Sequence, residues 1–215
     1  MAKQLDYHTI REIFERFQAA EAEPKGELEH VNVYTLVVAV ALSAQATDAG
    51  VNKATRELFK IADTPQKMLD LGLEGVTEHI KTIGLYNAKA ANVIKAARIL
   101  VDDFGGEVPE DRAALESLPG VGRKTANVVL QMFWGHPTIA VDTHVFRVSN
   151  RMGMAAGNNP DQVEDIIRMI NDIGIPVSEV APDGDSLFMS DAADDAAAEE
   201  AAAELSDYEP VEVLS

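Results

Sequence analysis

The stretch Leu118-Pro-Gly-Val-Gly-Arg-Lys-Thr-Ala-Asn127 decides the fold of this chain. Pro119, Gly120 and Gly122 predict a tight hairpin between a helix that ends at Leu118 and a second helix that starts near Arg123. A helix start carries unpaired N–H groups and the positive end of the helix dipole, which together attract phosphate. The stretch therefore predicts a helical hairpin whose backbone binds an anion, with Lys124 at its rim.

Further along the chain, the segment Asp142-Thr-His144 is predicted to open another helix. A lysine that acts as a nucleophile and a nearby carboxylate are the parts needed for imine chemistry at a sugar carbon. From these residues alone, two interpretations of each side chain stay open. Lys124 is either a nucleophile or a phosphate contact, and Asp142 is either a catalytic carboxylate or a helix cap.

The composition predicts a globular protein with a substantial core, since the chain has 215 residues of which 47 % are hydrophobic. The absence of cysteine excludes disulfides and thiolate metal sites. The polar N-terminus, residues 1–7, predicts no signal peptide. The longest apolar run, residues 34–42, is far shorter than the ~20 residues of a membrane span, so we expect no membrane association.

The net charge of −18 is unusual for a protein that binds phosphates, because Lys and Arg supply most of the affinity for nucleic acids. The acidic residues are concentrated at one end: residues 172–215 contain 13 of the 36 and no Lys or Arg. The remaining chain has 23 acidic and 18 basic residues, a net charge of −5. Residues 172–215 are predicted to form an acidic, low-complexity tail; a native tail and a frameshifted chain end both remain open.

Hydrophobic periodicity and capping residues predict an all-α protein, because no segment alternates like a strand between hairpin turns. Asp48 is expected to cap its helix, Thr64 and Pro65 to begin the next, and a short helix to follow Gly75. The other expected helices span residues 9–20, 32–44, 48–61, 87–104, 111–118, 123–134, 142–152 and 160–171.

Several separate motifs, in order, resemble one known family. Besides LPGVGRKTANVVL and the Asp-Thr-His segment, these are LSAQATD at residues 42–48, VNKAT at 51–55, IKTIGLYN at 80–87 and GEVPEDR at 106–112. Over roughly residues 8–170 the chain resembles the helix-hairpin-helix DNA glycosylases, and the endonuclease III group in particular. The resemblance is specific because several motifs agree, whereas the hairpin alone also occurs in many non-enzymatic DNA-binding proteins.

The resemblance implies the helix-hairpin-helix DNA glycosylase fold, with two helical lobes and a cleft between them. Residues 28–135 would form a six-helix lobe that contains the hairpin at about 111–134, and residues 1–27 and 136–171 a second lobe. This second lobe is expected to be incomplete. Members of the family usually carry a four-cysteine loop that holds a [4Fe–4S] cluster, and a chain without cysteine cannot ligate one. No cofactor and no metal ion are therefore expected.

The resemblance also implies a function: a base-excision repair DNA glycosylase with abasic-site lyase activity on oxidised pyrimidines in double-stranded DNA. Lys124 would attack the sugar carbon C1′ to form an imine, Asp142 would assist, and β-elimination would cut the strand. A monomer in the bacterial cytoplasm, associated with the nucleoid, is expected. The alternative is a catalytically impaired or non-catalytic DNA-binding module, because the iron–sulfur region is missing.

The family pattern further implies a set of DNA contacts: Gly120, Val121, Gly122, Arg123, Thr125 and His144. Gln45 and Leu85 would fill the gap left when a damaged nucleotide rotates out of the helix, because an inserted side chain offsets part of the lost stacking. The alternatives are an ordinary core position for Leu85 and a loop-ordering hydrogen bond for Gln45.

Overall fold

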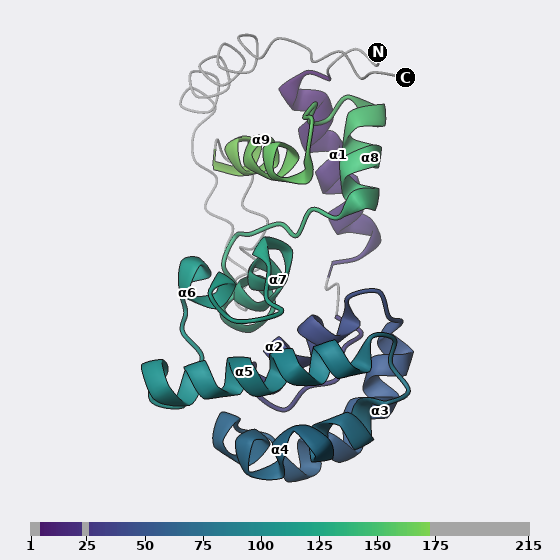
Figure 1. Ribbon diagram of the computed structural model, residues 1–215. Helices are drawn as coiled ribbons and strands as arrows, with labels where there is room; N and C mark the ends of the chain where they lie inside the picture. The colour runs from purple at the N-terminus through teal and green to yellow at the C-terminus, as the bar shows by residue number, and fades with distance from the viewer. Residues whose placement is uncertain (1–4, 23–25, 173–215) are drawn as a thin grey trace. The chain divides into compact units, whose positions relative to one another are not determined.

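The computed structural model describes residues 5–22 and 26–172 (Figure 1). The predicted acidic tail lies outside the described residues apart from Asp172. Within the described part the regular secondary structure is entirely helical and contains no strand, which confirms the all-α prediction. The helices are α1 (Tyr7–Ala20), α2 (Val33–Ser43), α3 (Asp48–Ile61), α4 (Pro65–Ile80), α5 (Tyr86–Phe104), α6 (Arg112–Glu116), α7 (Arg123–Trp134), α8 (Thr143–Met152) and α9 (Pro160–Asp172).

The described residues divide into two compact units, one within residues 26–138 and the other made of residues 5–22 and 139–172. The first unit contains α2 to α7, and the described part of the second contains α1, α8 and α9.

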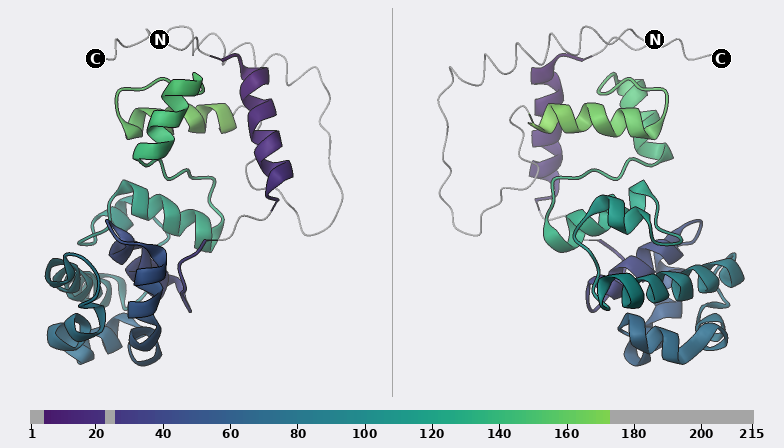
Figure 2. Two further views of the ribbon diagram at one scale, coloured as in Figure 1. Left: turned by 90° about the vertical axis from the view of Figure 1, so that its right-hand side faces the viewer. Right: turned by 60° about the vertical axis from the view of Figure 1, so that its left-hand side comes forward.

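Helix α2 is the centre of the first unit. It packs against α3, α5 and α7 (Figure 2), and eight of its eleven residues are buried. A helix that is apolar on all sides belongs in a core, and this composition explains the burial of α2. Its start is fixed by a capping box, in which the Thr35 N–H donates to Asn32 Oδ1 and the Asn32 N–H to Thr35 Oγ1.

Capping residues also fix the starts of α3 and α4. Thr64 accepts a hydrogen bond from the Lys67 N–H, with Pro65 as the first helical residue, as predicted. The prediction for α3 was wrong by one position: Thr47 is the cap, and Asp48 is the first helical residue. Both residue types cap helices well, so local sequence does not separate them.

The expected short helix is present but begins after Gly72 and not after Gly75: α4 consists of two helical pieces joined by a kink at Gly72, and the second piece runs to Ile80. Gly72 has a positive φ of 75°, a conformation that glycine adopts at low cost, and it turns the chain earlier than the sequence suggested. Helix α4 packs along α5 (Figure 1), and its residues Val76 and Ile80 are buried in the core of the first unit.

The second unit has its own small core, formed where α1, the segment before α8, and α9 contribute apolar side chains. Its buried members are Ile10, Val141, Ala155, Val163, Ile166 and Ile167. The Leu5 N–H donates to Gly153 O at 2.8 Å, which fixes the chain before α1 to the end of α8. In the described residues, no helix has both the length and the apolar character that crossing a membrane requires.

Candidate active site

The hairpin between α6 and α7 is anchored by two buried apolar residues, Leu118 and Val121. The Val121 N–H donates to Leu118 O at 3.0 Å and closes the turn. Gly120 has a φ of +86°, and a Cβ there would lie 3.3 Å from the side chain of Asn92 on α5. Both the backbone conformation and the close approach therefore require glycine at position 120.

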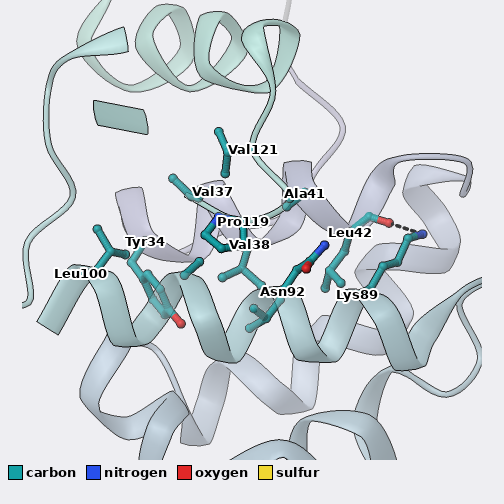
Figure 3. A pocket seen from close by; sticks show the side chains of 13 residues that line it. Tyr34, Val37, Val38, Ala41, Leu42, Lys89, Asn92, Leu100, Pro119 and Val121 are labelled. Atoms are coloured by element: carbon teal, nitrogen blue, oxygen red, sulfur yellow. Dashed lines mark hydrogen bonds between the residues drawn. The ribbon is translucent and has the colours of Figure 1, made fainter. Parts of the chain in front are cut away.

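A cavity of about 30 Å³ lies beneath this hairpin, between α2 and α5 (Figure 3). Its lining is mostly apolar, and the buried hydroxyl of Tyr34 has no hydrogen-bond partner within the described residues. Burial raises the pKa of this hydroxyl above its usual range. Since ligand pockets usually measure about 300–1,000 Å³, this cavity is a gap in the packing that supports the hairpin and not a nucleotide site.

Helix α7 begins without a side-chain cap, because its N-cap residue is Gly122. Gly122 and Lys124 are exposed, whereas Arg123 and Thr125 are half-buried. Ala126, Val129 and Leu130 on the same helix are buried in the core of the first unit. The packing of these residues fixes the helix in position, so its N-terminus presents backbone N–H groups, the positive end of the dipole and an exposed lysine together.

We expect a negative charge at position 122 to weaken DNA binding without unfolding the protein. The backbone of Gly122 is in the extended region at φ −100°, and no atom lies within 4 Å of a Cβ built there. Gly122→Asp would therefore fit and cap α7, but its charge would repel phosphate. Affinity for damaged and undamaged duplexes should fall together by roughly tenfold, since phosphate contacts carry no sequence information.

Gly122→Asn is the matched control, because asparagine has nearly the same shape and also caps helices. It should keep most of the affinity. A loss confined to damaged DNA in Gly122→Asp, measured by titrating both duplexes, would instead assign the hairpin to the lesion pocket.

Asp142 lies in the second unit and is the N-cap of α8, as one of the two interpretations predicted. One of its carboxylate oxygens, Oδ1, accepts from the N–H groups of His144 and Val145, each at 2.9 Å. Val141, immediately before it, is buried in the core of the second unit, while Asp142 is half-buried and His144 is exposed. The cap thus holds the carboxylate in a fixed orientation at the start of α8.

Gln45 and Leu85 are the two non-glycine residues with positive φ in the described part of the chain, at 56° and 60°. Leu85 is 66 % exposed, so the interpretation as an ordinary core residue is wrong. Gln45 is also exposed. Exposed side chains on backbone held in an uncommon conformation are typical of residues with a function, because the surrounding structure must maintain that conformation.

Sequence reasoning missed Lys89, which is only 9 % exposed and donates from Nζ to Leu42 O at 2.9 Å. Its position within the amphipathic segment 87–104 gave no sign of this contact. In the part of the chain that the structure describes, no group of three or more His, Asp or Glu residues is arranged to hold a metal ion.

Residues 38–171 match the family model of the HhH-GPD superfamily of base excision DNA repair proteins. The chain is 60 % identical to endonuclease III of Escherichia coli K12 over 154 residues, which are 72 % of this chain and 73 % of that protein. The chain belongs to the endonuclease III family. It is therefore a base-excision repair enzyme, a DNA glycosylase and abasic-site lyase that binds DNA.

Further relatives agree. Endonuclease III of Haemophilus influenzae is 58 % identical over 72 % of this chain and 73 % of its own length. A solved structure of a trapped endonuclease III–DNA covalent intermediate has a TM-score of 0.71 at 45 % identity, covering 75 % of this chain and 76 % of that one. A non-covalent endonuclease III–DNA complex has a TM-score of 0.73 at 44 % identity, covering 78 % of each chain. These structures confirm the fold.

The C-terminal part of the chain also matches a different family. Residues 154–205 match the model of Sigma-70 factor, region 1.1, so both family models match residues 154–171, which include most of α9.

The [4Fe–4S] cluster that the family resemblance implies does not fit this chain. Cluster iron is held by cysteine thiolates, and the sequence contains no cysteine. Neither unit can supply the ligands.

Proposed function

We propose that this endonuclease III family member excises oxidised pyrimidines from double-stranded DNA and cuts the strand at abasic sites through an imine on Lys124. The observation that carries the proposal is the exposed Lys124 at the uncapped start of α7, directly after the glycine hairpin. The Gly120–Gly122 backbone, Arg123 and Thr125 would hold a phosphate beside the lysine, and His144 would contact the backbone from the second unit.

The reaction begins when the unprotonated amine of Lys124 attacks C1′. The new C–N bond forms as the glycosidic bond breaks, and the base leaves with the bonding electrons and a proton. Loss of the amine proton and opening of the sugar ring give the imine. The imine then acts as an electron sink: a proton leaves C2′, and the 3′ phosphate departs by β-elimination. Water finally hydrolyses the imine and regenerates the lysine.

Asp142 would stabilise the positive charge that develops on the sugar, or accept the amine proton. Its capping hydrogen bonds from His144 and Val145 support this role, because they fix the orientation of the carboxylate. Gln45 and Leu85 would enter the gap that the rotated nucleotide leaves. Their exposure supports this, since a side chain that intercalates must be free of the core.

Lesion preference is tested by single-turnover excision from otherwise identical duplexes that carry thymine glycol, an oxidised pyrimidine, or 8-oxoguanine, an oxidised purine. Excision of thymine glycol should be faster by at least about tenfold, a difference of roughly 1.4 kcal/mol in transition-state binding. Equal rates, or a preference for the purine, would contradict the pyrimidine assignment. The non-catalytic alternative predicts excision of neither.

We also propose that residues 28–135 act as one six-helix lobe, that residues 1–27 and 136–171 act as a second, incomplete lobe, and that the enzyme is a monomer. One copy of the chain is sufficient for this function, because every side chain to which we assign a role belongs to the same chain. Since the similar proteins named above are bacterial and the substrate is duplex DNA, we infer that the enzyme acts in the cytoplasm on the nucleoid.

We expect the acidic segment to weaken DNA binding. It carries 13 negative charges, and covalent attachment gives it an effective concentration on the order of millimolar near the DNA-binding surface. A chain that ends at Asn171 should bind duplex DNA more tightly than the full chain, and the difference should shrink as salt rises. Affinity is measured for both chains from low to high salt, beside their melting curves.

A full-length chain in which the Asp and Glu residues of 172–215 are changed to Asn and Gln is the matched control. It should bind like the truncated chain. Weaker binding by a truncated chain that also melts earlier would show that the segment stabilises the second unit and does not compete with DNA.

A further inference from the structure

Lys89 is a buried lysine that the proposed reaction does not use. It lies in the first turn of α5, and its residue is 9 % exposed. Burial lowers the pKa of its amine. Burying an amine is costly unless a partner compensates, and here the partner is the carbonyl oxygen of Leu42, 2.9 Å from Nζ and 47 positions away in the sequence (Figure 3).

The carbonyl of Leu42 belongs to the last turn of α2, where carbonyl groups lack partners within the helix. Helix α2 does not end in a left-handed glycine that would satisfy these groups, since its C-cap Ala44 has φ −54° and ψ 115°. Lys89 therefore takes the place of a C-terminal cap. An amine at this end of a helix is also favoured by the helix dipole.

The backbone of Lys89 also forms a hydrogen bond to the exposed loop that contains Leu85. Its backbone N–H donates to Leu85 O at 3.1 Å and closes the first turn of α5. Leu85 has a left-handed backbone, and so has Gln45, three residues after Leu42. The two loops are neighbours, because a Cβ on Gly84 would lie 4.0 Å from Gln45 O.

We propose that Lys89 is a positioning residue for DNA: through Leu42 O and Leu85 O it holds the Gln45 and Leu85 loops together as one rigid wedge. This inference rests on the DNA contacts proposed above for Gln45 and Leu85. Without the bond to Leu42 O, α2 and α5 keep their apolar contacts, but the two left-handed residues lose the link that fixes them relative to each other. The nucleotide would then rotate out less completely, while Lys124 would remain intact.

The test uses the full chain and Lys89→Met, which keeps the length and apolar stem of lysine but removes the donor. The first readout is the fluorescence of 2-aminopurine placed beside an unreactive tetrahydrofuran abasic analogue in a duplex, which rises as the neighbouring stack opens. The second is single-turnover cleavage of a true abasic duplex. Lys89→Met should reduce the fluorescence rise at least threefold and slow cleavage by roughly tenfold or more.

Borohydride trapping on a single-stranded abasic oligonucleotide should be unchanged in Lys89→Met, because no duplex has to open there. If the wild-type protein itself is not trapped on this oligonucleotide, the proposed function fails, independently of Lys89. Lys95→Met is the matched control: Lys95 is exposed on the same helix, so this variant removes the same charge and should behave like the wild type in both duplex assays.

A double-mutant cycle separates positioning from general stabilisation. In a Leu85→Ala background, Lys89→Met should cause little further loss of fluorescence, because the two changes act through the same wedge. If Lys89→Met does not fold, Lys89→Leu, which is also apolar and has no donor, replaces it. Wild-type fluorescence and cleavage per folded molecule in the variant, even with a lower melting temperature, would overturn the proposal.

Discussion

Lys124→Gln is expected to abolish imine trapping and to lower strand cleavage at abasic sites by roughly 10³-fold or more, while duplex binding survives. Glutamine is polar and of similar reach, so the exposed start of α7 keeps its shape. It has no amine that can bond to C1′, and β-elimination then lacks its electron sink. Single-turnover cleavage and duplex titration of the same preparation measure the two effects.

Lys53→Gln is the control for the loss of one positive charge, since Lys53 is exposed on α3 in the same unit. It should cleave at the wild-type rate. If Lys124→Gln also cleaves at that rate, the lysine is only a phosphate contact, as the alternative interpretation of the sequence has it.

Asp142→Asn should slow the reaction by ~10²–10⁴-fold with little change in melting temperature. Asparagine caps helices about as well as aspartate, so the bonds from the His144 and Val145 N–H groups are retained. Only the negative charge is lost. Rates per folded molecule are compared with melting curves for the two proteins.

Asp6→Asn provides the comparison, because Asp6 caps α1 in the same unit and accepts from the Thr9 N–H at 2.9 Å. Neither the reaction rate nor the melting temperature of the Asp6→Asn protein should change appreciably. If Asp142→Asn keeps the wild-type rate but has a much lower melting temperature, Asp142 is only a structural cap.

The helices and the hairpin were predictable from the sequence because local rules govern them. Pro119 and Gly120 separate two segments of helical periodicity. Helix α7 has the bounds that this periodicity predicts. Neighbouring caps were not separable: Thr47 and Asp48 are both good N-caps, and only packing selects one. The kink at Gly72 was missed for a similar reason, since Gly72 and Gly75 are equally permissive and tertiary contacts choose between them.

The geometry around Gln45 and Leu85 was not predictable. Local preferences place neither residue in a left-handed conformation, and nothing near Lys89 in the sequence indicates a carbonyl 47 positions away. Such contacts arise only when α2 and α5 pack.

The central claim is that Lys124 bonds covalently to DNA in a chain that cannot hold an iron–sulfur cluster. It is tested most directly by reducing the wild-type protein with borohydride on an abasic duplex, digesting the adduct and locating the modified peptide by mass. The account predicts a nucleotide-derived mass on Lys124, in the peptide that follows the Pro119–Gly122 turn. No adduct, or an adduct on another lysine, would contradict it.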